Sequence, residues 1–489
     1  MRKPLPVITS FFLLSISILI AREEPASIHR QQWLEHSNIP KAPSLFDVSG
    51  ADIRPISFLK TEVLTRAVFG YLPDWEYYSA RNTLQYDLLS HIAAFDFMVN
   101  ASGGIGNPSY WPWTDVINAA HDNGVRVIMT AVNFDKDEIH TILTNSTVKN
   151  TFFKNVKSKI ETYKLDGVNV DFEGLYKEDR GSLLNGFMRD LTNYIHSNLP
   201  GREVSFAGPA VNWGGWDLAG LADACDYIFI MGYAFAGSWS SKSAANAPLT
   251  GGSYNITNTV TIQYGAVTNN RPDKLILGVP YYGNHWKTET SSAYSTIIEY
   301  ISHPRFSSAM PEALNDGLRW DSNSQTPWYA YQESGVWHQV WFDTDSSLGL
   351  KYDLAESKDY RGVGMWALGY DGSRKELWDE LRRRYVPNSI ENTVATNSPD
   401  EFVLYQNYPN PFNPETAIPY FVRAIHESPV QLEIYNILGQ KIVTLVDEPQ
   451  PTGRYEVTWD AFGLSSGVYL YRLSVNNRLS RFKKMILLR

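Results

Sequence analysis

Two carboxylates and an amide alternate with apolar residues in the stretch 165–174, LDGVNVDFEG. In a β-strand, Asn169, Asp171 and Glu173 point to one face, and the apolar residues between them point to the other. Carboxylates are costly to bury unless they are paired or hydrogen-bonded, and two close together raise the pKa of one of them. An acid still protonated near neutral pH can protonate a glycosidic oxygen. The stretch predicts glycosidase chemistry; the alternative, a polar edge strand, is disfavoured by the branched apolar face.

The elements that must position these groups follow an α/β alternation. Short β-rich runs, separated by longer amphipathic segments, occur at 68–72, 91–97, 125–132, 167–173, 204–209, 227–233, 275–282 and 362–368. Eight strands with intervening helices predict a (β/α)8 TIM barrel. Active groups in such barrels sit at the C-terminal ends of the strands, and Glu173 ends the fourth run.

The segment 166–173, DGVNVDFE, resembles the DxxDxDxE signature of glycoside hydrolase family 18, the chitinases and their relatives. The resemblance implies that Glu173 is the catalytic acid and that the substrate's own acetamido group is the nucleophile. It also implies that Asp171 orients the acetamido nitrogen and stabilises an oxazolinium ion. The sequence departs from the signature at Asn169. We expect the Asn169 amide to donate a hydrogen bond to Asp171 and keep it ionised.

Other strand ends resemble the same family. Met231 and Tyr233 match its MxY element, whose tyrosine holds the acetamido oxygen, and Trp366 matches the tryptophan that floors the reactive subsite. The expected catalytic residues are Glu173, Asp171, Tyr233 and Asn169, and the expected substrate-binding residues are Tyr71, Met231, Tyr282, Trp366 and Trp286. Each aromatic residue alone would be a core residue by default. Further departures are Ala234, Asn284 and the third-strand stretch 130–133.

Composition and motifs narrow the function further. The chain has 489 residues, a net charge of -9 and a single cysteine, Cys225, so a nucleic-acid partner and an intramolecular disulfide are not expected. There is no HExxH, paired CxxC, phosphate loop or GxSxG motif, and we expect no metal and no cofactor. Residues 1–21 have the pattern of a signal peptide, and no stable membrane span is expected.

The domain organisation is expected to have two folded parts. Residues 22–65 are a linker or lead-in with one short helix around 31–36, and 66–387 form the barrel, with a small α+β insertion subdomain at about 285–347. The aromatic residues of this insertion either stack on sugars or form its own core. Residues 388–401 are a linker, and 402–489 are predicted to form an all-β sandwich.

The C-terminal part resembles the type A sorting domain of the type IX secretion system, through YQNYPNPFNP at 405–414, YNILGQ at 435–440 and the terminal KKMILLR. That resemblance implies a secreted or cell-surface protein with the type IX machinery as a partner; a chitin-binding module is the rival interpretation. The expected function is a secreted retaining hydrolase of β-1,4 bonds in a polysaccharide that contains N-acetylglucosamine (GlcNAc), with chitin favoured. The alternatives are a non-catalytic lectin or a hydrolase of peptidoglycan or N-glycans.

Overall fold

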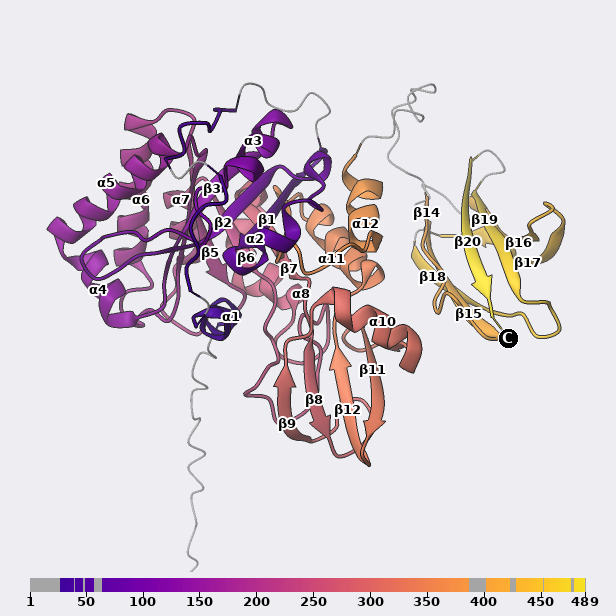
Figure 1. Ribbon diagram of the computed structural model, residues 1–489. Helices are drawn as coiled ribbons and strands as arrows, with labels where there is room; N and C mark the ends of the chain where they lie inside the picture. Colours follow the sequence, from indigo (N-terminus) through magenta and orange to yellow (C-terminus); the bar gives the residue numbers. More distant parts are fainter. Residues whose placement is uncertain are drawn as a thin grey trace, which may run out of the picture.

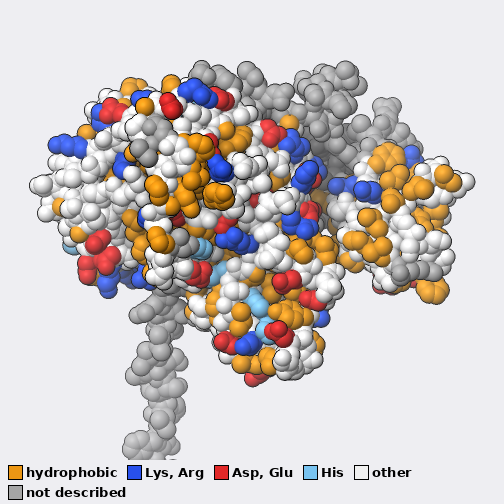
Figure 2. Space-filling view, viewed as in Figure 1, with side chains coloured by type: hydrophobic (Ala, Val, Ile, Leu, Met, Phe, Trp, Pro, Cys, Tyr) orange, Lys and Arg blue, Asp and Glu red, His pale blue; other side chains and the backbone are white. Residues whose placement is uncertain are grey.

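The computed structural model describes residues 27–38, 40–46, 49–56, 64–386, 402–422, 428–451, 453–475 and 479–488. The predicted signal peptide and the predicted linker at 388–401 lie outside the described residues. Within the described segments, every helix is too short or too polar to cross a bilayer. On the face drawn in Figure 2, acidic and basic side chains are interspersed.

A closed barrel of eight parallel strands forms the centre of the protein (Figure 1), as the sequence predicts. The strands follow one another around the barrel in the order β1-β13-β7-β6-β5-β4-β3-β2. Their bounds are β1 Ala67–Pro73, β2 His91–Met98, β3 Arg126–Asn133, β4 Gly167–Phe172, β5 Glu203–Pro209, β6 Tyr227–Met231, β7 Leu275–Pro280 and β13 Gly362–Trp366. Each of the eight predicted runs overlaps one of these strands.

The helices around the barrel include α2 Asp74–Ala80, α3 Thr114–Asp122, α4 Lys136–Thr144, α5 Ser146–Thr162, α6 Ser182–Asn198, α7 Leu218–Ala224, α8 Ile256–Asn258, α9 Gly265–Asn270, α11 Asp345–Ser357 and α12 Glu376–Tyr385. Short helical turns lie at η1 Tyr86–Leu88, η2 Thr259–Gln263 and η3 Pro272–Lys274.

Strand β4 is placed by packing on its outer face and by close pairing with β5 along one edge. The ring of Phe172 packs outward against Phe152 of α5 and Phe187 of α6, with ring centroids 5.9 Å and 6.1 Å away. Gly167 permits close pairing with β5, because a Cβ there would lie 2.3 Å from the carbonyl oxygen of Glu203. The alternation then turns Asn169 and Asp171 into the barrel.

The insertion between β7 and α11 is an antiparallel sheet with the strand order β10-β11-β12-β8-β9. It contains β8 Asn284–Thr288, β9 Ile297–Ser302, α10 Phe306–Asp316, β10 Arg319–Asp321, β11 Thr326–Glu333 and β12 Val336–Trp341. The rings of Trp328 and Trp341 stack with centroids 5.1 Å apart, and both residues are buried. These two tryptophans therefore form the core of the subdomain, which was one of the two expected roles.

The described residues after the 387–401 gap form two antiparallel sheets, as predicted. One sheet has the order β14-β15-β18 and the other β17-β16-β19-β20. The strands are β14 Phe402–Leu404, β15 Glu415–Val422, β16 Ser428–Asn436, β17 Lys441–Gln450, β18 Gly453–Asp460, β19 Gly467–Val475 and β20 Leu479–Leu487. Their buried side chains make a hydrophobic cluster of their own, separate from the cluster of the barrel.

Helix α1, Ile28–His36, precedes the barrel in the chain, close to the position predicted for a short helix. In Figure 1 it lies at the lower edge of the barrel, on the side that carries the insertion sheet. The chain after it is fastened to the barrel by Lys41, whose ammonium lies 2.5 Å from Asp74 and 2.9 Å from Asp96. Residues 28–36 are therefore helical, within the segment expected to be a linker or a lead-in with one short helix.

Candidate active site

The C-terminal end of β4 carries the predicted carboxylates. Asp171 is fully buried, and Glu173 follows the strand with its side chain 10 % exposed. The backbone N–H of Glu173 donates to the carbonyl oxygen of Asn133 at 3.0 Å, which fixes its position beside β3. Because successive side chains alternate, both acids reach the same end of the barrel.

Asn169 does not perform the role that the sequence suggested. Its Nδ2 donates to Ser205 Oγ at 2.9 Å, and its Oδ1 accepts from the Tyr71 hydroxyl at 2.7 Å. Both ends of the amide are engaged below the acids, and Oδ1 of Asp171 has no hydrogen-bond partner among the described residues. The expectation that Asn169 donates to Asp171 is therefore wrong. Asn169 and Tyr71 instead form a buried polar layer beneath the site.

Aromatic residues from other strand ends surround the acids. Trp366 ends β13 and is fully buried, and Tyr233 follows β6 by two residues. Tyr282 follows β7, is also buried, and meets the Tyr233 ring edge-on at 6.2 Å. Met231, the last residue of β6, lines the open cavity described below. The structure thus brings these four predicted residues to the same end of the barrel as Glu173.

Trp286 is an exception among the predicted binding residues. It is fully buried in the core of the insertion sheet, in a hydrophobic cluster with Ala236, Ala245, Trp328 and Trp341. A ring with no exposed face cannot stack on a sugar. The prediction that Trp286 binds substrate is wrong, because this side chain packs in the hydrophobic core of the subdomain.

Helix α1 reaches into the site with three side chains that the sequence did not single out. The imidazole of His29 is fully buried: Nδ1 lies 2.8 Å from Asp171 Oδ2, and Nε2 lies 2.8 Å from the Tyr233 hydroxyl. The same ring stacks on Trp366 with a centroid distance of 3.7 Å and an interplanar angle of 26°. His29 therefore occupies the space between the two polar groups and above the indole.

The other two side chains complete the contact. Ser27, the N-cap of α1, donates from its Oγ to Glu173 Oε1 at 2.7 Å and accepts from the backbone N–H of Arg30 at 3.0 Å. Gln32 Oε1 accepts from Trp366 Nε1 and from the Tyr370 hydroxyl, both at 2.7 Å. The sequence gives little sign that this helix docks, because the helix buries polar side chains and lacks the apolar stripe by which a packed helix is usually recognised.

Burial sets the protonation of the His29–Asp171 pair. Desolvation raises the pKa of Asp171 to about 8 and lowers the pKa of His29 to about 4, although nearby Glu173 raises the latter. At neutral pH the two groups are thus both uncharged and joined by a hydrogen bond rather than an ion pair. Burial also raises the pKa of the Tyr71 and Tyr233 hydroxyls well above their usual value, so both keep their protons.

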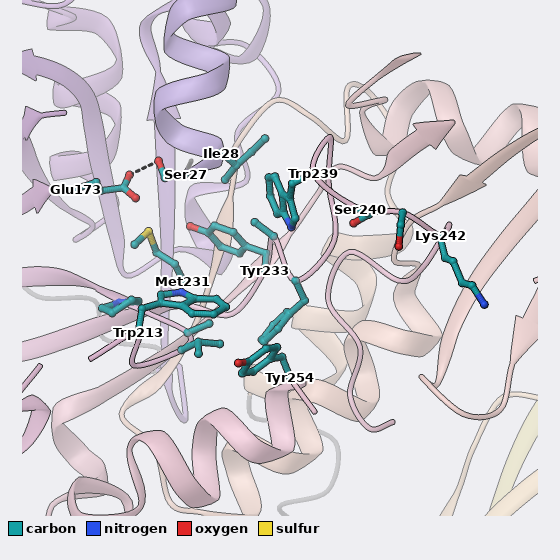
Figure 3. Close-up of a pocket in the computed structure, with 16 residues that line it drawn as sticks. Ser27, Ile28, Glu173, Trp213, Met231, Tyr233, Trp239, Ser240, Lys242 and Tyr254 are labelled. Carbon is teal, nitrogen blue, oxygen red and sulfur yellow. Dashed lines mark hydrogen bonds between the residues drawn. The ribbon is translucent and has the colours of Figure 1, made fainter. Parts of the chain in front are cut away.

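An open cavity of about 690 Å³ adjoins the site. Figure 3 shows Glu173 and Ser27 at one end of it, hydrogen-bonded to each other, and Lys242 at the other. Trp213, Trp239 and Tyr254 also line the cavity, and Trp239 and Tyr254 are 40 % and 38 % exposed. Exposed aromatic rings beside an acid are suited to stacking on sugars, and the sequence did not mark these three.

A metal ion is not needed to explain the cluster. Ligand atoms of His29, Asp171 and Glu173 lie within 4.8 Å of one another, a spacing that a cation could use. However, direct hydrogen bonds already join Asp171 to His29 and Glu173 to Ser27.

A carboxylic acid at the end of the fourth strand of a closed (β/α)8 barrel, beside a buried second carboxyl and over an aromatic floor, defines a glycoside hydrolase site. The family profile of the glycosyl hydrolases family 18 matches residues 67–371. The chain belongs to this family. The profile of a secretion system C-terminal sorting domain matches residues 406–488.

Two relatives are similar to this chain over the barrel. Human di-N-acetylchitobiase is 27% identical over 303 residues, which are 55% of this chain and 75% of that protein. The cortical fragment-lytic enzyme of Bacillus subtilis is 26% identical over 307 residues, 60% of this chain and 67% of that protein.

Solved structures share the fold. The spore cortex-lytic enzyme SleL of Bacillus cereus superposes with a TM-score of 0.56 at 22% identity, over 66% of this chain and 75% of that one. A family 18 chitinase of Cycas revoluta gives 0.57 at 17% identity, over 65% of this chain and 99% of that one.

Proposed function

We propose that this protein is a retaining hydrolase that cleaves β-1,4 bonds next to N-acetylglucosamine by substrate-assisted catalysis. The observation that carries the proposal is the convergence of Asp171 Oδ2 and the Tyr233 hydroxyl. Each lies 2.8 Å from one of the two nitrogens of a single small ring, and that ring lies flat over Trp366. An acetamido group also presents two polar atoms on either side of one carbon, so the same pair of protein groups can hold it.

In the proposed reaction, Glu173 protonates the oxygen of the leaving sugar while the acetamido carbonyl oxygen attacks the anomeric carbon. The bond to the leaving group breaks and an oxazolinium ion forms. In its ionised form, Asp171 accepts a hydrogen bond from the acetamido N–H and stabilises the positive charge, and Tyr233 donates to the acetamido oxygen. Glu173, now ionised, takes a proton from water, which attacks the same carbon and opens the ring with the β configuration restored.

The other aromatic residues have proposed binding roles. Trp366 supports the reacting sugar from below, and Tyr282 and Met231 bound the same subsite. The cavity beside Glu173, lined by Trp213, Trp239 and Tyr254, is suited to the leaving part of the chain.

Chitin is the proposed polymer, because the chain is similar to proteins named di-N-acetylchitobiase. Peptidoglycan is the second candidate, and the similarity to cortical fragment-lytic enzymes favours it. Both polymers have the acetamido group that the mechanism needs. Product release from chitin hexasaccharide and from purified peptidoglycan, measured side by side, separates the two.

The sorting domain carries the proposal of export. Its match at 406–488 supports passage through a type IX secretion system and an extracellular or cell-surface location. The N-terminal signal pattern predicts the preceding step across the inner membrane.

The test is Glu173→Gln, compared with Glu178→Gln, an exposed residue five positions on that undergoes the same chemical change. Turnover of a fluorogenic chito-oligosaccharide should fall at least about 100-fold in the first variant and stay unchanged in the second. Binding of chitotriose, measured by calorimetry, should survive in both. Residual turnover of Glu173→Gln within tenfold of the parent would remove the assignment.

A further inference from the structure

Helix α1 fills the subsite in which the proposed mechanism places the reacting sugar. His29 contacts Asp171, Tyr233 and Trp366, the three residues proposed to hold the sugar and its acetamido group. Ser27 engages Glu173, the proposed acid. A sugar cannot reach these groups while the helix is docked, since the imidazole already occupies the space between them.

The His29 imidazole resembles the proposed oxazolinium intermediate in chemistry as well as in position. Imidazole is a flat five-membered ring in which two nitrogens flank one carbon, and the oxazolinium ion is a flat five-membered ring in which a nitrogen and an oxygen flank one carbon. Nδ1 of His29 is hydrogen-bonded to Asp171, the proposed partner of the oxazolinium nitrogen. Nε2 is hydrogen-bonded to Tyr233, the proposed partner of the oxazolinium oxygen. His29 therefore presents the features of the intermediate rather than those of an ordinary core residue.

The helix is held by contacts beyond the subsite. His36 stacks on Trp75 with a centroid distance of 4.5 Å, and Gln31 Oε1 lies 3.3 Å from Nε2 of His303 in the insertion. Lys41, five residues after the helix, is bound between Asp74 and Asp96. A short tether of this kind keeps the helix at a high effective concentration, so that a free substrate competes poorly.

A nine-residue helix is not stable by itself in water, and its docking depends on polar side chains that match the cleft. Polar groups buried in this way are costly unless all are paired. Loss of one central partner should therefore release the helix without affecting the barrel, which has its own hydrophobic core.

We propose that residues 27–36 are an intramolecular inhibitor of the catalytic cleft, with His29 as a mimic of the reaction intermediate, and that full activity requires displacement of this helix. The proposal rests on the proposed function, since it is the substrate subsite that the helix blocks.

The test compares the full-length chain with His29→Ala and with Arg30→Ala, whose side chain is exposed on the same helix. His29→Ala should raise kcat/KM for a fluorogenic chito-oligosaccharide at least tenfold and should tighten chitotriose binding to a similar extent. Arg30→Ala should stay within twofold of the parent. Equal kcat/KM in the parent and in His29→Ala would overturn the proposal.

A second measurement reports docking without reference to activity. Hydrogen exchange followed by mass spectrometry should show amides of residues 30–36 protected in the parent and exchanging at least tenfold faster in His29→Ala, with the barrel strands unchanged. Protection that persists in His29→Ala would overturn the proposal. If exchange behaves as expected but no variant hydrolyses or binds the glycan, the helix does dock as described, and it is the proposed function that fails.

Discussion

Gln32→Leu is a sharp perturbation of the docked helix, because Gln32 touches none of the groups proposed to transfer a proton. Its Oε1 accepts two hydrogen bonds of 2.7 Å, from Trp366 Nε1 and from the Tyr370 hydroxyl, and its side chain is almost completely buried. Leucine is a good helix former of similar size but offers no acceptor. In Gln32→Leu, the Trp366 and Tyr370 donors are left unpaired while the helix is docked. When the helix leaves, water can reach both donors.

The magnitude follows from those two bonds. A buried hydrogen bond contributes about 0.5–1.5 kcal/mol net, so the docking free energy should weaken by roughly 1–3 kcal/mol. That range corresponds to a shift of about 5- to 150-fold in the docking equilibrium. Since only the undocked form binds substrate, kcat/KM should rise by the same factor until the cleft is fully open, mainly through a lower KM.

The assay is steady-state hydrolysis of a fluorogenic chito-oligosaccharide by the parent, by Gln32→Leu and by Arg30→Leu as the exposed control on the same helix. Arg30→Leu should match the parent. Thermal melting should show that all three barrels remain folded. If Gln32→Leu had a kcat/KM within twofold of the parent, docking of α1 would not limit access to the cleft, and the reasoning would fail.

Three further predictions concern other parts of the molecule. Burial raises the pKa of Asp171 to about 8 and lowers the pKa of His29 from 6.5 to about 4. Above about pH 6.5 the free His29 is already neutral, so docking only adds a proton to Asp171. Docking should therefore weaken as the pH rises through 8. The ratio of kcat/KM between His29→Ala and the parent should therefore shrink between about pH 6.5 and 8.5, and a constant ratio would contradict this. Asn169→Asp places a carboxyl in a fully buried site, where desolvation raises its pKa; its melting temperature should fall further below the parent at pH 7.5 than at pH 4.5, by roughly several °C. Deletion of residues 402–489 should leave kcat/KM unchanged and the barrel's melting temperature within about 3 °C, because the two hydrophobic clusters share no residue; an unfolded product would show that they depend on each other.

The barrel was predictable because its signal is repeated and local. Each strand is a short apolar run, and helices such as α3, α6 and α12 have one apolar face, so both periods can be read in the sequence. The C-terminal sheets were predictable for the same reason. The direction of the polar residues on β4 also followed from alternation, and Asp171 and Glu173 lie where it places them.

Contacts between distant segments were less accessible. Asn169 was expected to bond upward to Asp171, but Tyr71 of β1 and Ser205 of β5 take both ends of its amide. Trp286 was expected to meet substrate, but it is claimed by the core of the insertion. The docking of helix α1 in the cleft was not predictable from the sequence, because the hydrogen-bond partners of His29 and Gln32 lie more than 140 residues away.

The configuration of the first product is the measurement that tests the proposed chemistry most directly. Proton NMR during the first minutes of chitin-oligosaccharide hydrolysis, with His29→Ala to keep the cleft open, distinguishes the two anomers before they equilibrate. Attack by the acetamido group and then by water inverts the anomeric carbon twice, so the β-anomer should appear first. An α-anomer as the first product would contradict the mechanism assigned to Glu173, Asp171 and Tyr233.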